Sequence, residues 1–137
     1  MDVFTKAKRS SVMAAIRPRG NRSTERAFAA LLRCARISGW TLHATDVPGR
    51  PDFFFRARAL AVFVDGCFWH GCRRCYKAPR QNAAFWASKI GGNCRRDRAV
   101  GRILRRDGIR VIRIWEHDIE RRTLRLKKVL DRLRSMQ

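Results

Sequence analysis

Apolar residues along the chain repeat at two spacings, which predict a helix, three strands, a second helix, a fourth strand and a final helix. Intervals of three and four residues are typical of a helix with one buried face, and short runs of β-branched and aromatic residues are typical of strands. The expected helices cover residues 23–37, 83–106 and 119–136, and the expected strands cover residues 40–42, 52–55, 60–65 and 109–115. The last two strands are far enough apart for a crossover, which predicts an α/β sandwich with a mixed sheet.

The second and third strands are close enough in sequence to form a hairpin. With Arg58 and Ala59 at the tip, Asp52 would lie opposite Asp65, with Cβ atoms within about 5.5 Å of each other. Neither tip residue is Gly or Asn, so this register could slip by one residue. In either register, both acids are expected at the open end of the hairpin.

Polar residues interrupt the buried faces of two expected helices. Glu25 lies on the inward face of the first helix, and Asn93 and Asp97 take inward positions on the long helix. Taken alone, Glu25 suits a helix N-terminus and Asp97 could pair with an arginine. Together with Asp52 and Asp65 they form a set of four inward acids, which one shared hard cation explains better than four separate causes. Oxygen ligands with room for water favour Mg²⁺.

The formal net charge of +21 indicates a polyanionic partner, and nucleic acid is the first to consider. Residues 1–20 are basic and are expected to lie along DNA. A membrane-surface protein would also be cationic, but the sequence shows neither a lipid-facing amphipathic helix nor an acylation motif. A length of 137 residues predicts a single domain over residues 1–137. The sequence has no apolar leader and no run approaching about 18 apolar residues, so we expect the protein in the cytoplasm.

The reaction expected of such acids is phosphodiester hydrolysis. Mg²⁺ on a DNA phosphate would stabilise the developing negative charge and lower the pKa of an attacking water. His70, which follows Asp65 by five residues, could take the proton from that water. A histidine beside cysteines is about as often a zinc ligand, so both roles stay open for His70.

Three cysteines in the segment 66–80 predict a zinc loop. Cys67, Cys72 and Cys75 supply three thiolates at close spacing, and a tetrahedral site needs one more ligand. The candidates are His117, His70 and Cys94. We favour His117, because a ligand from a distant strand would add folding free energy that a local ligand cannot. Cys34 is expected to be a small core residue.

Several runs of the sequence are long and specific. They are Thr5-Lys6-Ala7, Arg9-Ser10, Met13, Glu25, Pro48-Gly49-Arg50-Pro51-Asp52-Phe53, Gly66-Cys67-Phe68-Trp69-His70, Phe85-Trp86, Lys89-Ile90, Asn93, Arg96-Asp97-Arg98 and Trp115-Glu116. In these runs, which span nearly the whole chain, the sequence resembles the very short patch repair (Vsr) mismatch endonucleases.

The resemblance implies a restriction-endonuclease-like three-layer fold, a structural zinc ion, and Mg²⁺-dependent nicking of one DNA strand 5′ of the T in a T·G mismatch, which arises when 5-methylcytosine deaminates. It implies that Asp52 is the principal Mg²⁺ ligand, that Glu25 and Asp97 act near the metal-bound waters, and that His70 is the general base. Asn93 is expected to support the site. The implied wedge residues, which enter the base stack, are Met13, Phe68 and Trp69. We expect a monomer on duplex DNA, with mismatch-repair and repair-synthesis proteins as further partners.

The sequence departs from the family pattern at both metal sites. Val64-Asp65 replaces Thr-His: the Val64 carbonyl could still bind Mg²⁺, and Asp65 would add a charged ligand. In the zinc loop, Cys72 stands where His is expected, Cys75 is shifted by one position, and His117 stands where Cys is expected. Four nitrogen and sulfur ligands remain, so zinc is still expected.

Two other functions fit parts of the sequence. One is a sequence-specific, homing or restriction-type nuclease of the same fold. The other is a non-catalytic zinc protein that binds nucleic acid through charge, which accounts for the basic residues and the cysteines but not for the four inward acids.

Overall fold

The computed structural model describes residues 22–136 and has every element that the sequence predicts in that range. Its elements are α2 (Arg22–Cys34), β1 (Thr41–Leu42), β2 (Phe53–Phe55), the 3₁₀ turn η2 (Arg56–Arg58), β3 (Leu60–Asp65), α3 (Ala83–Arg106), β4 (Arg110–Trp115), α4 (Glu116–Arg121) and α5 (Leu124–Ser135). The basic segment 1–20 and Met13 lie outside the described residues.

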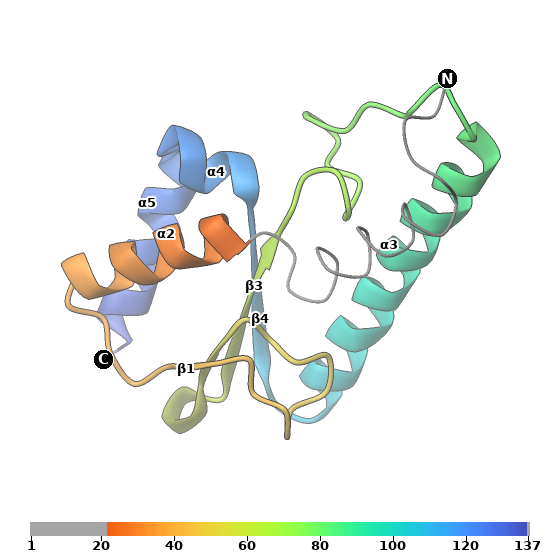
Figure 1. The fold of residues 1–137 in the computed structure, drawn as a ribbon. Helices are drawn as coiled ribbons and strands as arrows, with labels where there is room; N and C mark the ends of the chain where they lie inside the picture. Colours follow the sequence, from red (N-terminus) through yellow and green to blue (C-terminus); the bar gives the residue numbers. More distant parts are fainter. Residues whose placement is uncertain (1–21, 137) are drawn as a thin grey trace.

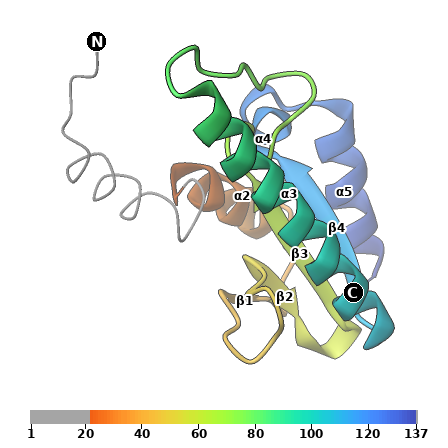
Figure 2. The same cartoon turned by 90° about the vertical axis from the view of Figure 1, so that its right-hand side faces the viewer.

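The four strands form one mixed sheet in the order β1-β2-β3-β4. β1, β2 and β3 pair antiparallel, whereas β3 and β4 pair parallel, with α3 in the crossover between them. Figure 1 shows the sheet nearly edge-on, with α2, α4 and α5 on one side and α3 on the other, and Figure 2 shows α3 running along the strands. The predicted mixed α/β architecture is therefore confirmed.

Apolar residues alternate between the two faces of the sheet. Val62 and Val64 of β3 belong to the core under α2 and α5, whereas Ala61 and Phe63 pack with Leu104 of α3. All six residues of β3 are buried, because helices cover the strand on both faces. Asp65 is thus a buried acid at the end of a strand that is otherwise wholly apolar.

The predicted hairpin register is wrong by two residues. Phe53 pairs with Val62 and Phe55 with Leu60, so Asp65 extends two residues beyond the position opposite Asp52. The reason is the turn. A two-residue tip needs positive φ at its first position in a type II′ turn or at both positions in a type I′ turn, which favours Gly and Asn. The chain instead curls through η2 and reverses at Ala59, which has a φ of 49°.

The predicted closing helix over 119–136 is also wrong in one respect, because it is two helices. α4 begins at Glu116 and ends at Arg121, and Arg122, which caps it, has a φ of 53°. Thr123 caps the start of α5 by accepting a hydrogen bond from the Leu126 N–H at 3.3 Å. The Thr123 hydroxyl also donates to Asp118 at 2.7 Å, which fixes the joint between the helices. Within residues 22–136, none of the helices has the length and apolar character needed to cross a membrane.

Candidate active site and zinc centre

One end of the sheet gathers nearly all the side chains that the sequence analysis selects from residues 22–136. β2 starts at this end, β3 and β4 finish there, and the zinc loop and α4 continue from it. Three groups of metal-ligating side chains lie in this region, and within each group the ligand atoms are within 4.8 Å of one another. The groups are Glu25 with His43 and Asp52, Asp65 with His70 and Asp97, and Cys67 with Cys72, Cys75 and His117.

The first group joins α2 to the start of β2. Glu25 is 5% exposed, and its Oε2 lies 2.9 Å from Nε2 of His43. His43 follows β1, and its N–H donates to the Asp52 carbonyl at 3.2 Å. The Asp52 carboxylate accepts a hydrogen bond from the Val64 N–H at 2.7 Å, which fixes its position against β3.

Burial raises the pKa of Asp52 to about 8. The Val64 N–H opposes this shift, whereas the nearby carboxylates of Glu25 and Asp65 add to it. Two acids held together in a desolvated site cannot both ionise easily without a compensating cation. The donor set of the first group, two carboxylates and an imidazole, therefore suits a divalent cation.

The second group links the loop after β3 to the middle of α3. The Nδ1 atom of His70 lies 2.5 Å from Oδ2 of Asp97 and 3.8 Å from Oδ1 of Asp65. Arg113 of β4 contacts both oxygens of Asp65 through Nη1, at 3.0 and 3.1 Å. The group is therefore a network of three charged residues around one imidazole.

The charges in this network shift two pKa values upward. Burial opposes the charged form of His70, but the hydrogen bond to Asp97 and the nearby Asp65 outweigh it and raise the pKa of His70. Burial also raises the pKa of Asp65, against the opposing effect of His70 and Arg113. His70 can therefore hold a proton more readily than an isolated imidazole.

The sequence predicts one set of four acids around a shared cation, whereas the structure arranges them as two groups. Glu25 and Asp52 lie in one group, and Asp65 and Asp97 in the other. The two-residue shift of the hairpin separates Asp52 from Asp65 in the ladder. The groups still influence each other, because Asp65 contributes to the raised pKa of Asp52.

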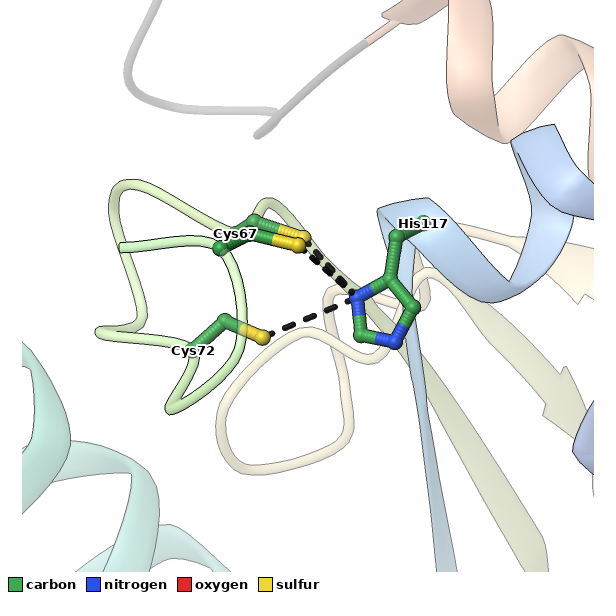
Figure 3. Close-up of side chains that lie close together, drawn as sticks. Cys67, Cys72 and His117 are labelled. Carbon is green, nitrogen blue, oxygen red and sulfur yellow. Dashed lines mark hydrogen bonds between the residues drawn. The ribbon is translucent and has the colours of Figure 1, made fainter. Parts of the chain in front are cut away.

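The third group has the geometry of a tetrahedral zinc site. The sulfurs of Cys67, Cys75 and Cys72 lie 3.3, 3.4 and 3.6 Å from Nδ1 of His117. Figure 3 shows Cys67 and Cys72 of the loop and His117 of α4 pointing toward one another. A tetrahedral zinc ion would hold sulfur and nitrogen ligands about 3.5 Å apart. Three thiols cannot all hydrogen-bond to one imidazole nitrogen, so the convergence fits a common metal ion better.

Neighbouring acids orient the side chains that could hold zinc. Nε2 of His117 lies 3.6 Å from Oδ1 of Asp118, an arrangement that directs Nδ1 toward a metal. Glu116 accepts from the Cys67 N–H at 3.3 Å and from the Thr24 hydroxyl at 3.4 Å, which ties the loop to α2. Without a cation, burial raises the pKa of the Cys67 thiol to about 12. A bound metal would supply the charge that stabilises the thiolate.

A family model described as DNA mismatch endonuclease Vsr matches residues 1–77. The DNA mismatch endonuclease Vsr of Escherichia coli is 38% identical over 117 residues, which cover 84% of this chain and 73% of that protein. The type II nicking enzyme V.XorIIP of Xanthomonas oryzae is 34% identical over 135 residues, which cover 95% of this chain and 97% of that protein.

The chain belongs to the Vsr DNA mismatch endonuclease family. This confirms the family that the sequence motifs indicate, and the protein is an endodeoxyribonuclease. A further relative, the type II nicking enzyme V.NaeI of Lentzea aerocolonigenes, is 46% identical over 69 residues. That match covers 50% of this chain and 42% of V.NaeI.

In this Vsr-family chain, α3 supports the backbone of the loop between β3 and α3. Asn93 is 6% exposed, and its amide donates to the Trp69 carbonyl at 3.0 Å. The Cys94 thiol donates to the His70 carbonyl at 3.4 Å. Cys94 and His70 therefore contact each other and lie outside the zinc quartet, the candidate site of Cys67, Cys72, Cys75 and His117. Cys34 is exposed, so its predicted core position is wrong.

Phe68 and Trp69, the two expected wedge residues that lie in the described range, belong to an aromatic cluster. The Phe68 ring lies 5.2 Å from Trp69, 5.3 Å from Trp86 and 5.6 Å from Tyr76, measured between centroids. Phe68 and Trp69 are half-buried, and Phe85, which contacts Trp86, is 56% exposed. The aromatic rings of the cluster therefore pack on one another while part of their surface stays exposed to solvent.

Sequence reasoning missed His43 and Arg113. His43 could have been found from the ladder, because β1 pairs with β2 and the next residue after β1 falls beside Asp52. No pattern in the sequence points to Arg113, because the chain has 32 basic residues and many of them could pair with a given acid.

Proposed function

We propose that this endonuclease nicks one DNA strand on the 5′ side of the T in a T·G mismatch, in a reaction that requires Mg²⁺. The observation that carries the proposal is the pairing of two functions at one end of the sheet. Glu25 and Asp52 form a desolvated carboxylate pair, and at the same end of the sheet His70 is held by Asp97. The carboxylate pair can bind a cation, and His70 can accept a proton. We also propose that the sheet and its helices have a restriction-endonuclease-like fold.

Asp52 and the backbone carbonyl of Val64 would hold Mg²⁺, with Glu25 and His43 beside them. Bound Mg²⁺ supplies stabilisation of the negative charge that develops on the scissile phosphate. The protein contributes rigidity, because the Val64 N–H fixes Asp52 and Nε2 of His43 fixes Glu25. Carboxylates held in place before the metal arrives need little reorganisation during the reaction.

His70 serves as the general base in this account. A hydrogen bond from Nδ1–H to Asp97 keeps the proton on that nitrogen and leaves Nε2 to accept a proton from the attacking water. Asp97 also stabilises the imidazolium that results, as its effect on the His70 pKa indicates. Asn93 and Cys94 contribute indirectly, because they donate hydrogen bonds to the backbone carbonyls of Trp69 and His70 and so hold the loop in place.

Recognition of the mismatch is assigned to Phe68 and Trp69, with Met13 from the basic N-terminal segment. Opening a base step for an aromatic wedge costs a few kcal/mol and costs least at a mismatch, so insertion favours mismatched DNA. A structural zinc ion at Cys67, Cys72, Cys75 and His117 would anchor the loop that carries the wedge. We further propose that a monomer acts, upstream of mismatch-repair and repair-synthesis proteins.

The names of the relatives support one alternative target. V.XorIIP and V.NaeI are described as type II nicking enzymes, which allows a sequence context around the mismatch or a short sequence alone. End-labelled duplexes that carry each mismatch in randomised flanks separate these targets. Nicking only at T·G, with the cut 5′ of the T, supports the proposal. Equal nicking of fully paired duplexes supports a sequence-specific nuclease instead.

A further inference from the structure

Arg113 places one guanidinium against both acids of the second group. Nη1 contacts the two oxygens of Asp65 at 3.0 and 3.1 Å and lies 3.8 Å from Oδ1 of Asp97. Nη2 donates to the backbone carbonyl of Asp97 at 3.4 Å. The guanidinium therefore bridges the end of β3 and the middle of α3.

The sheet holds this side chain in place. Arg113 pairs with Phe63 in the parallel ladder, and its guanidinium carbon lies 4.3 Å from the centre of the Phe63 ring. Its side chain is only 26% exposed. A planar cation held by a ring on one side and by two carboxylates ahead of it has little freedom to move away.

The neighbouring first group differs in this respect. Among residues 22–136, no Lys or Arg side chain forms an ion pair with Asp52. Burial and the nearby carboxylates of Glu25 and Asp65 also raise the pKa of Asp52. Two acid groups thus lie near each other, and within residues 22–136 an arginine pairs with Asp65 and Asp97 but none pairs with Asp52.

We propose that Arg113 is the resident cation of the Asp65, His70 and Asp97 group. It occupies the charge position that a divalent ion would need, so it keeps such ions out of this group. It also holds Asp97 against Nδ1 of His70 and is, in that sense, a positioning residue. Asp65 is then an anchor for Arg113 rather than an Mg²⁺ ligand. The inference goes beyond the proposed function and does not depend on the DNA target.

The probe is Mn²⁺, counted by electron paramagnetic resonance on the full zinc-loaded chain without DNA. The neutral variant Arg113→Met should bind one more Mn²⁺ than the wild type, because Asp65, His70 and Asp97 have ligand atoms within 4.8 Å of one another. Adding Asp65→Asn to that variant should remove the extra site. The matched control is Arg110→Met on the same strand, an exposed arginine whose side chain donates to the Arg58 carbonyl. Its Mn²⁺ count should equal that of the wild type.

The positioning role has its own readout in the ¹⁵N NMR signals of the His70 ring. Arg113→Met without Mn²⁺ should shift the Nδ1 signal away from that of the wild type, because Asp97 loses its support. Arg113→Lys keeps the charge and should restore both the signal and the wild-type Mn²⁺ count. A Lys variant that behaves like the Met variant would contradict exclusion by charge.

An unchanged Mn²⁺ count in folded Arg113→Met overturns the proposal. If that variant melts far below the wild type, millimolar Mn²⁺ should raise its melting temperature back, because the ion replaces the missing cation. The proposal is also overturned if Mn²⁺ does not raise the melting temperature of Arg113→Met, whereas adding Asp65→Asn to that variant does raise it. No step measures nicking, so these results stand apart from any failure of the T·G proposal.

Discussion

Nδ1 of His70 lies 2.5 Å from Oδ2 of Asp97, joining the zinc-loop segment to α3. This contact sets both the orientation and the proton affinity of the imidazole. It places a half-buried histidine at the same end of the sheet as Glu25 and Asp52, which is consistent with the hydrolytic role proposed above.

The first prediction tests this contact through Asp97→Asn. The amide can no longer stabilise the imidazolium, so single-turnover nicking should slow by about a hundredfold or more. Because Asp97 contributes to the raised pKa of His70, the acidic limb of the pH–rate profile should also move to lower pH. Rates measured from pH 5 to 9 check both effects. An unchanged limb would separate Asp97 from the base, and Asp107→Asn, on an exposed acid after α3, is the control.

A second prediction concerns Mg²⁺ affinity and pH. With the pKa of Asp52 at about 8, metal binding below that pH must displace a proton. The apparent affinity should rise roughly tenfold per pH unit from pH 6 to 8 and then level off. Glu25→Gln removes one cause of the shift and should move the plateau to lower pH. Calorimetry in buffers of different ionisation enthalpy measures the proton released, and pH-independent affinity would contradict the charge state assigned to Asp52.

The same pKa fixes the sign of a stability change in metal-free protein. The folded state keeps a proton on Asp52 between about pH 4 and 8, whereas the unfolded chain has lost it. The free energy of unfolding contributed by Asp52 should therefore fall as pH rises through this range. Asp52→Asn should flatten that part of the curve in urea titrations.

The zinc quartet gives a third prediction. The wild type should contain one zinc per chain by elemental analysis, and His117→Ala should lose most of it together with thermal stability, because three thiolates remain without their fourth ligand. His117→Cys should keep the metal. Cys94→Ser is the matched control, since Cys94 contacts the His70 carbonyl rather than the quartet. Full zinc content in His117→Ala would place the fourth ligand elsewhere.

The fourth prediction tests the wedge through Phe68→Ala. Affinity for paired duplex should stay almost unchanged at a fixed salt concentration, because phosphate contacts dominate it. The preference for T·G should fall sharply, because Phe68 supplies part of the inserted surface. Leu124→Ala, on an exposed apolar residue of α5, is the control. If the preference ratio of Phe68→Ala equals that of the wild type, another element selects the mismatch.

Much of the fold follows from the sequence because the apolar pattern is strong. The expected long helix over 83–106 has the bounds observed for α3. The hairpin register did not follow, since nothing in the pattern indicates that Arg56 to Arg58 would form a 3₁₀ turn. The break at Thr123 was missed for a related reason. Thr123 caps α5 through its side chain, and apolar spacing does not register such a contact.

The site was predictable to a similar extent. Thiol spacing indicated three of the zinc-site residues, and a strand-end position indicated the fourth, and the structure brings all of them together. The inward acids were found because they interrupt apolar faces. The sequence does not predict their division into two groups, because that division depends on which side chains contact one another across the sheet. Arg113 reaches Asp65 from a neighbouring strand, and no local pattern distinguishes it from other arginines.

Single-turnover nicking of a duplex with one T·G mismatch, by the wild type and by Asp52→Ala, tests the central claim most directly. The wild type should cut once, 5′ of the T, with Mg²⁺ and not with EDTA. Asp52→Ala should bind the duplex nearly as well yet cut at least about a thousandfold more slowly, because the cation loses its principal ligand. Asp46→Ala, on an exposed acid paired with Arg56, should cut like the wild type. Mg²⁺-dependent nicking that survives in Asp52→Ala would contradict the account.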